Sequence, residues 1–195
     1  MTTHAHLQNM PPCTLANASA KQQELLQAAN KAIGFIPNMY ARMVIAPDLL
    51  AMYQLGYKAV REQSGFSAIE QEVIFLTISQ LNGCKYCSAA HSMLADKVSL
   101  VPENVWQAIN QGHPLEDIKL AALNQVVSEM VTKNGHVSEQ AFKAFESAGY
   151  SHHQMLYLIM AIATKTISNF TNHLFATPVD APFAAYQLDS NSSIT

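Results

Sequence analysis

The sequence predicts an all-α domain. Apolar residues recur at the three- and four-residue spacing of amphipathic helices along most of the chain, and the alternating runs typical of strands are missing. Glycines and prolines fall between these helical segments and mark their ends. The length of 195 residues fits one domain. We expect residues 17–186 to form it, residues 1–16 to be a flexible N-terminal segment and residues 187–195 to be a loose tail.

The first two helices are expected on either side of a proline. Residues 17–32 form the first of them. Pro37 then interrupts the helical pattern, because a proline disfavours helix in the residue before it. The second helix is expected over residues 47–63. Its inner face is predicted to carry Leu49, Met52, Tyr53 and Val60.

A central helical hairpin is expected next. Ser67 and Glu70 form a capping box before a run that is hydrophobic on most sides, which predicts a third helix at the centre of the domain. Residues 82–83 end this helix, and a fourth helix is expected over residues 84–97. If the chain reverses at residues 82–83, the two helices run antiparallel.

The remaining chain is also helical in pattern until close to its end. Further helices are expected over residues 102–110, 116–133, 138–148 and 151–174. The last of these is long and mostly apolar. Residues 176–186 contain two prolines and are expected to break regular structure.

The composition limits the classes of function. Charged residues make up only 13% of the chain and hydrophobic residues 49%, so we expect apolar surface to be buried in a homo-oligomer. The net charge of -3 offers no basic field for nucleic acid. The start of the chain lacks the segments of a secretory signal, and the apolar run at residues 155–163 is too short to span a bilayer. We therefore expect a cytoplasmic protein that binds neither nucleic acid nor membrane.

The segment NGCKYCSAAH, residues 82–91, contains two of the three cysteines. On a helix, Cys84, Cys87 and His91 share one face, and both cysteines lie near the helix N-terminus, where the dipole favours a thiolate. His91 lies one turn after Cys87, but roughly 10 Å from Cys84 along the axis. This difference predicts Cys87 as the activated nucleophile and Cys84 as the resolving thiol.

Glu72 is the candidate partner for His91. In an antiparallel hairpin its carboxylate is level with roughly residue 94, one turn from His91, and it would hold the imidazole tautomer and stabilise its charge. The alternative is a carboxylate that only favours the N-terminal end of its helix.

Zinc binding is the main alternative for the cysteine segment, since Cys84, Cys87 and His91 supply three ligands. A structural zinc site usually takes its second pair of ligands from a separate loop, and no other histidine lies in a suitable pattern. A chance grouping of the three residues is the other alternative. The redox interpretation, with no metal, is the one that the shared face favours.

The run from Glu72 through ISQLNGCKYCSAAH closely resembles the alkylhydroperoxidase D-like (AhpD-like) proteins of the carboxymuconolactone decarboxylase superfamily. Their signature is a glutamate twelve residues before the first cysteine of C-x-x-C and a histidine four residues after the second. The same spacings hold here for Glu72, Cys84, Cys87 and His91. The flanking runs IGFIPNMYARMVIAPDLLAMY and ISNFTNHLFATPVDAPF resemble the peroxidase-related branch, so the resemblance covers roughly residues 30–186.

The resemblance implies an all-α AhpD-like fold, usually assembled into trimers or hexamers, and thiol-dependent reduction of small hydroperoxides. It implies that Cys87 attacks the peroxide and becomes a sulfenic acid, and that Cys84 then forms a disulfide with it. His91 and Glu72 would relay the proton. An external dithiol, such as a lipoyl group on a carrier protein, would reduce the disulfide without a bound cofactor.

One position departs from the family pattern. The best-known members have a histidine just before the second cysteine, where this chain has Tyr86. The change removes one proton donor or marks a different substrate. We expect Tyr86 to pack away from the cysteines, with its hydroxyl within reach of the site mouth.

The alternative function is disulfide exchange with another protein, or the sensing of redox state, without peroxide turnover. Decarboxylation is not expected, since the named decarboxylases generally lack the C-x-x-C pair.

Overall fold

The computed structural model describes residues 5–187, so the expectations for residues 1–4 and 188–195 lie outside the described part. Within residues 5–187 the chain forms α-helices and one 3-10 helix with no strand, which confirms the all-α prediction. The elements are α1 (Ala20–Ile33), α2 (Asn38–Met43), α3 (Pro47–Gln63), α4 (Ala68–Leu81), α5 (Lys85–Lys97), α6 (Glu103–Gln111), α7 (Ile118–Thr132), α8 (Glu139–Ser147), α9 (His152–Phe175) and η1 (Ala181–Tyr186).

Eight of these helices match the predicted ones within a few residues, and two short elements were not predicted. Pro37 keeps Ile36 out of helix as expected, but its own conformation opens α2 directly afterwards. The expectation that residues 176–186 break regular structure is wrong in part, because η1 forms there with Pro182 in its first turn. Upstream of α1, the amide of Leu7 donates a hydrogen bond to the carbonyl of Leu174 at 2.9 Å.

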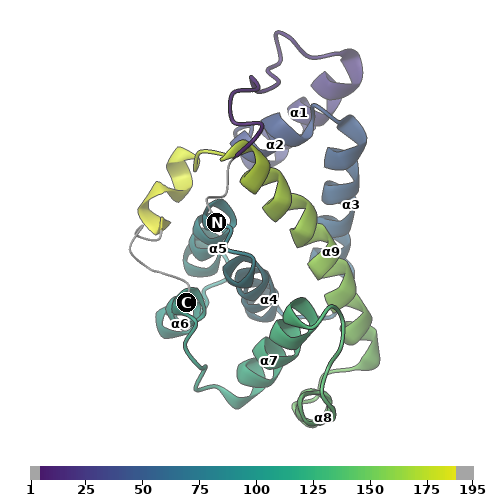
Figure 1. Cartoon of the computed structure of the whole chain (residues 1–195), viewed down its shortest axis with the longest axis vertical. Coiled ribbons are helices and arrows are strands. Elements are labelled where there is room, and N and C mark those ends of the chain that lie inside the picture. Colours follow the sequence, from purple (N-terminus) through teal and green to yellow (C-terminus); the bar gives the residue numbers. More distant parts are fainter. Residues whose placement is uncertain (1–4, 188–195) are drawn as a thin grey trace.

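Helix α4 lies at the centre of the molecule (Figure 1). Its capping box forms as predicted: the Ser67 hydroxyl accepts a hydrogen bond from the Glu70 amide, and the Glu70 carboxylate accepts one from the Ser67 amide. Every residue from Glu70 to Ser79 is buried. The helix packs against α5, α6, α7 and α9, so that polar side chains on it are enclosed by the core.

The turn between α4 and α5 fixes the hairpin. Gly83 has a φ of 65°, in the left-handed region that glycine adopts at no steric cost. The amide of Cys84 then donates to the carbonyl of Ser79 at 2.9 Å. The Asn82 amide group donates to Oδ1 of Asn169 at 2.8 Å, which ties the turn to α9. The start of α5 is thereby held against α9.

Helix α3 lies along α9 (Figure 1), and one glycine sets their approach. A Cβ atom at Gly56 would be 2.4 Å from Oγ1 of Thr164. The prediction that Met52 lies on the inner face of α3 is wrong, because this residue is 65% exposed. Leu50 faces the core instead, and position 52 lies about 200° away from it around the helix. Tyr53 and Val60 are buried as expected.

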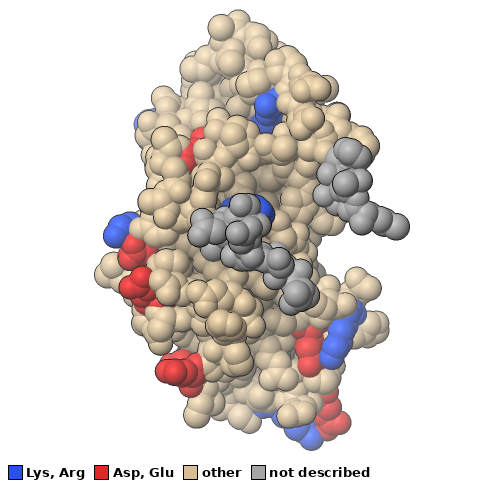
Figure 2. Space-filling view, turned by 60° about the vertical axis from the view of Figure 1, so that its left-hand side comes forward, with Lys and Arg blue, Asp and Glu red and all other residues tan. Residues whose placement is uncertain are grey.

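Much of the described surface is apolar or neutral. Charged side chains are scattered on the face shown in Figure 2 and leave wide uncharged areas between them. Exposed apolar residues include Leu55 on α3 and Leu156, Ile159 and Phe170 on α9. No helix between residues 5 and 187 combines the length and the apolar character needed to cross a bilayer.

We predict that Gly56→Ala destabilises the protein by about 1–3 kcal/mol, although alanine normally stabilises a helix interior. The added Cβ would collide with the Thr164 hydroxyl and push α3 away from α9. Urea unfolding of the single variant and of Gly56→Ala combined with Thr164→Ala measures the effect. The second substitution should recover much of the lost stability. A single variant as stable as the original protein would contradict the close approach.

Candidate active site

The two cysteines of the C-x-x-C motif lie at the N-terminal end of α5. Cys84 is the N-cap residue and Cys87 lies in the first turn. Both are free thiols, and their exposed fractions are 1% and 2%. Each thiol shifts the pKa of the other. Cys87 lines a pocket that opens beside it, whereas Cys84 lies behind Cys87 and outside the pocket lining.

Helix α9 presents a polar face to these sulfurs. Lys165, Ser168 and Asn172 are spaced three and four residues apart, so they share one side of the helix, and all three are buried. The Asn172 amide Nδ2 lies 3.3 Å from Sγ of Cys87 and 3.7 Å from Sγ of Cys84. The Ser168 hydroxyl lies 3.8 Å from Sγ of Cys87.

The two thiols differ in acidity. Burial would raise the pKa of Cys87, but the hydrogen bond from Cys84 and the charge of Lys165 hold it well below its usual value. The hydrogen bond to Cys87, together with burial, raises the pKa of Cys84. Cys87 is therefore the thiolate and Cys84 the protonated thiol, in the arrangement that a nucleophile and its resolving partner require.

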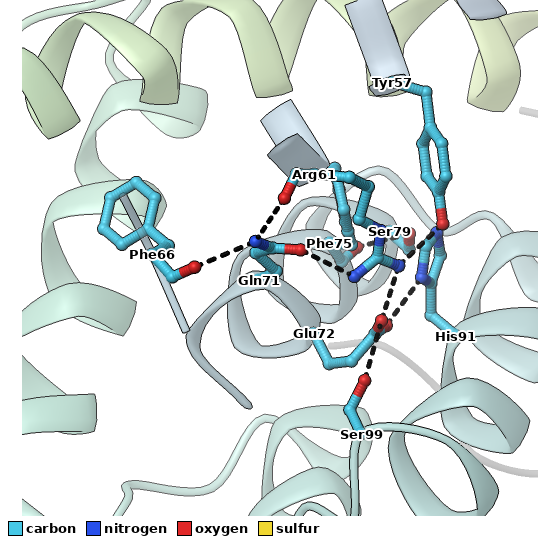
Figure 3. A network of polar contacts seen from close by, with 9 residues as sticks. All are labelled: Tyr57, Arg61, Phe66, Gln71, Glu72, Phe75, Ser79, His91 and Ser99. Carbon is cyan, nitrogen blue, oxygen red and sulfur yellow. Dashed lines mark hydrogen bonds and ion pairs between the residues drawn. The ribbon is translucent and has the colours of Figure 1, made fainter. Parts of the chain in front are cut away.

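Glu72 and His91 face each other across the α4–α5 hairpin, as the spacing predicted. Nδ1 of His91 lies 2.8 Å from Oε2 of Glu72 (Figure 3). Burial would favour a neutral Glu72, but His91 and Arg61 hold the pKa of this carboxyl below its usual value. An ionised carboxylate only accepts hydrogen bonds, so Nδ1 carries the proton and Nε2 is left as the free acceptor.

The Glu72 carboxylate has a second strong partner that the sequence reading missed. Nη2 of Arg61 lies 2.5 Å from Oε1 of Glu72 and 2.6 Å from the hydroxyl of Tyr57 (Figure 3). Because Arg61 offsets the charge of Glu72, burial and the nearby Lys165 lower the pKa of His91 to about 4. His91 is thus neutral near pH 7. Glu72 fixes its tautomer, as expected, but the carboxylate does not keep the imidazole charged.

The pocket beside Cys87 has a volume of about 580 Å³, within the range of sites for small organic ligands. Its walls come from α1, α2, α3, α5 and α9 and from the segment that contains η1. Most of the lining is apolar or aromatic, and includes Phe35, Met39, Tyr40, Tyr53, Met93 and Phe183. Cys87, His91 and Lys165 bring the polar groups. The pocket suits an apolar molecule with one reactive polar group.

Tyr86 lines the same pocket as Cys87, so it reaches the site mouth as expected. Its hydroxyl donates to Asp180 and is not bonded to either sulfur. Asp180 also accepts a hydrogen bond from the backbone amide of Asn38 at 3.0 Å. The carboxylate therefore connects α5, the start of α2 and the segment before η1. Tyr86 holds a pocket wall and does not replace the family histidine near the sulfurs.

The described part of the chain contains no cluster of ligands for zinc. Between residues 5 and 187, no group of three or more His, Cys, Asp or Glu side chains is arranged to hold a metal ion. Cys84 and Cys87 are held by the amide of Asn172 instead.

The sequence reading missed Arg61, Asp180 and the polar face of α9. One signal was present for α9. A lysine, a serine and an asparagine recur at helical spacing in a helix that is otherwise mostly apolar, at positions 165, 168 and 172. Such polar residues on a buried helix need polar partners, and the face of the cysteine motif offers them. Asp180 had no periodic pattern to reveal it.

We predict that Asn172→Ala moves the pH profile of Cys87 alkylation to higher pH. The amide hydrogen bond favours the thiolate, and a hydrogen bond to a charged group contributes about 1.5–3 kcal/mol. Because the thiolate is the reactive form, the alkylation rate at pH values below the midpoint should fall about tenfold or more. Iodoacetamide labelling with mass spectrometry at each pH measures it. The control is Thr171→Ala on the same helix, whose hydroxyl bonds to Ile167. An unchanged midpoint in Asn172→Ala would contradict the role of the amide.

A protein-family model matches the part of the chain that contains this site. The sequence model of the carboxymuconolactone decarboxylase family matches residues 47–128, which span Glu72 and the C-x-x-C motif. No curated protein matches the chain in sequence.

Solved structures of similar fold agree with this match. An uncharacterized peroxidase-related protein of Ralstonia eutropha JMP134 with an alkylhydroperoxidase AhpD core has a TM-score of 0.75 and 19% identity over 89% of this chain and 92% of its own. An uncharacterized peroxidase-related protein of Silicibacter sp. TM1040 has a TM-score of 0.71 and 18% identity over 90% of this chain and 95% of its own.

The debrominase Bmp8 has the same fold. A cysteine-to-alanine variant of it, in complex with 2,3,4-tribromopyrrole, has a TM-score of 0.74 and 18% identity over 91% of this chain and 95% of its own. The part of the chain with the cysteine hairpin, residues 47–128, matches the model of the carboxymuconolactone decarboxylase family, and the solved structures show that the chain has an AhpD-like fold.

Proposed function

We propose that this protein is a thiol-dependent reductase of organic hydroperoxides. The observation that carries the proposal is the position of Cys87 in the wall of an apolar pocket, with a second buried thiol, Cys84, three residues before it and outside the pocket lining. A nucleophile that meets its substrate on one side and its resolving partner on the other can pass through a complete oxidation cycle without a large movement of the chain.

The reaction has two steps. The Cys87 thiolate attacks the terminal oxygen of the hydroperoxide, the O–O bond breaks, and an alkoxide leaves and takes up one proton. Cys84 then attacks the sulfenic acid on Cys87, which forms the disulfide and releases water. The proton lost by Cys84 is needed by the departing hydroxide. His91 lines the pocket beside Cys87 with a free Nε2, and is placed to relay this proton while Glu72 holds its ring.

The pocket favours a bulky apolar substrate and a slender reductant. Its aromatic lining and volume of about 580 Å³ suit an aromatic or branched alkyl hydroperoxide better than hydrogen peroxide. Because both sulfurs are almost fully buried, a folded domain cannot reach them with its own cysteines. A dithiol on a flexible arm, such as a lipoyl group on a carrier protein, fits this route, and the protein itself needs no bound cofactor.

The assembly and location form part of the same proposal. Exposed apolar residues on α3 and α9, together with the low fraction of charged residues, support a homo-oligomer. A cytoplasmic enzyme would keep its dithiol reduced between turnovers. Both thiols are free in this structure.

We predict that the protein reduces cumene hydroperoxide at the expense of a dithiol and that Cys87→Ser abolishes this activity. Cys84→Ser should complete one attack and stop at a Cys87 sulfenic acid, because its resolving thiol is missing. Peroxide consumption and intact-protein mass spectrometry after one equivalent of peroxide measure both outcomes. Cys13→Ser, at the third cysteine, is the matched control and should stay active.

Either of two other results would contradict this proposal. Full peroxide consumption by Cys87→Ser would show that Cys87 is not the nucleophile. A wild-type disulfide that forms and is reduced by dithiols, with no peroxide turnover, would instead indicate a thiol–disulfide exchange protein or redox sensor.

Reductive dehalogenation of an aromatic compound is a second candidate, and the aromatic lining of the pocket favours it. A dithiol supplies the two electrons: the carbon–halogen bond is replaced by a carbon–hydrogen bond, a halide ion leaves, and the cysteines form a disulfide. The debrominase Bmp8 shares the fold, and its variant binds a brominated pyrrole.

If dehalogenation is the function, incubation of the protein with a brominated pyrrole and a dithiol should release bromide, which ion chromatography detects. No bromide above the level of Cys87→Ser would exclude it.

A further inference from the structure

Lys165 is the most unusual residue of the site. It lies in the middle of α9 with an exposed fraction of 1%, and its side chain borders the pocket. Its ammonium group makes no hydrogen bond or ion pair with any residue between 5 and 187, and its Nζ atom lies 5.8 Å from the centroid of the Phe75 ring. A buried charge without a partner is costly, so this cation needs an anion inside the pocket.

The anion cannot be a carboxylate of the pocket. None of the residues between 5 and 187 that line the pocket is an aspartate or a glutamate. Glu72, just behind His91, is already paired with Arg61. The thiolate of Cys87 remains, and the charge of Lys165 helps to keep its pKa low. In the reduced protein, Lys165 and Cys87 therefore balance one another.

This balance is lost during the proposed reaction. As the Cys87 thiolate attacks the peroxide, its negative charge passes to the leaving oxygen, which lies inside the same apolar pocket. An alkoxide there is strongly basic and needs a proton. The ammonium of Lys165 carries three protons that no described neighbour holds by hydrogen bonding.

The other groups around the pocket are poorly suited to supply this proton. His91 uses its Nδ1 proton to bond Glu72 and has a bare Nε2. The hydroxyl of Tyr86 is bonded to Asp180. Burial raises the pKa of both Tyr53 and Tyr40, which makes them weak acids.

The hydroxyl of Tyr57 is held by another partner. It accepts a hydrogen bond from Arg61 at 2.6 Å, and burial raises its pKa as well. Of the ionisable groups that line the pocket, Lys165 is the one whose N–H protons are held by no described residue and whose side chain borders the space for a substrate oxygen.

We propose that Lys165 is the proton donor to the leaving alkoxide, and thus a further catalytic residue of the proposed hydroperoxide reductase. Thiolate, hydroperoxide and ammonium become sulfenic acid, alcohol and neutral amine, so protons and charge balance within the pocket. The amine regains a proton from solvent or from the thiols when the external dithiol reduces the disulfide. This role rests on the proposed function.

Two classes of peroxide separate this role from simple stabilisation of the thiolate. Cumene hydroperoxide leaves as a basic alkoxide that must be protonated, whereas a perbenzoic acid leaves as a carboxylate that needs no proton. We expect Lys165→Met to slow oxidation of Cys87 by cumene hydroperoxide by about 10²–10⁴-fold, the usual contribution of general acid catalysis. The rate with perbenzoic acid should fall far less when both proteins are compared at a pH where Cys87 is fully ionised. Single-turnover kinetics followed by intact-protein mass spectrometry measure the rates.

Two matched variants complete the experiment. Lys165→Arg keeps a cation but holds its proton too firmly to give it up, so it should retain an acidic Cys87 and still be slow with cumene hydroperoxide. Lys143→Met removes a lysine whose side chain is 68% exposed on α8 and should behave as wild type. An equal loss for both peroxides in Lys165→Met would show a structural or purely electrostatic role and overturn the proposal.

Wild-type protein alone gives an independent check if Lys165→Met does not fold. With a proton donor in place, oxidation rates should depend only weakly on the basicity of the leaving group across a series of alkyl hydroperoxides and peracids. A steep dependence would overturn the assignment to Lys165. A wild-type protein that reduces no peroxide of either class would instead refute the proposed function.

Discussion

The site depends on charge balance inside an apolar helical core. Arg61, Glu72 and Lys165 are charged groups in or at the edge of the interior, and an isolated charge there is strongly unfavourable. Arg61 and Glu72 neutralise each other and leave His91 uncharged. Lys165 is then left to be neutralised by Cys87. The acidity of one sulfur thus follows from how the cations and the carboxylate of three helices are paired.

Local sequence signals predicted the part of the site that lies on α4 and α5. The capping box at Ser67, the turn at residues 82–83 and the spacing of Cys84, Cys87 and His91 are short-range features, and the hairpin brings Glu72 to His91 at 2.8 Å. Regular hydrophobic periodicity was likewise enough to locate the long helices. These features depend on residues within a few turns of one another, which is the range over which a single sequence is informative.

The rest of the site depends on which faces of distant helices meet. Arg61 reaches Glu72 because α3 packs beside the hairpin, and Asn172 reaches the sulfurs because α9 crosses the start of α5. Met52 was placed on the wrong face because an apolar residue in an amphipathic helix does not by itself show which side is covered. The wall around η1 has no helical period, so only the structure reveals the contact of Asp180 with Tyr86.

The division of the pocket between two kinds of chain segment has an evolutionary consequence. The reactive sulfurs belong to a rigid hairpin at the centre of the fold, whereas much of the opposite wall comes from α1, α2 and the stretch around η1, near the two ends of the chain. Residues such as Phe35 and Phe183 thus shape the pocket from segments outside the hairpin that carries the dithiol. Changes in these outer segments can then fit the same dithiol hairpin to differently shaped molecules, and the fold is shared by peroxidase-related proteins and a debrominase.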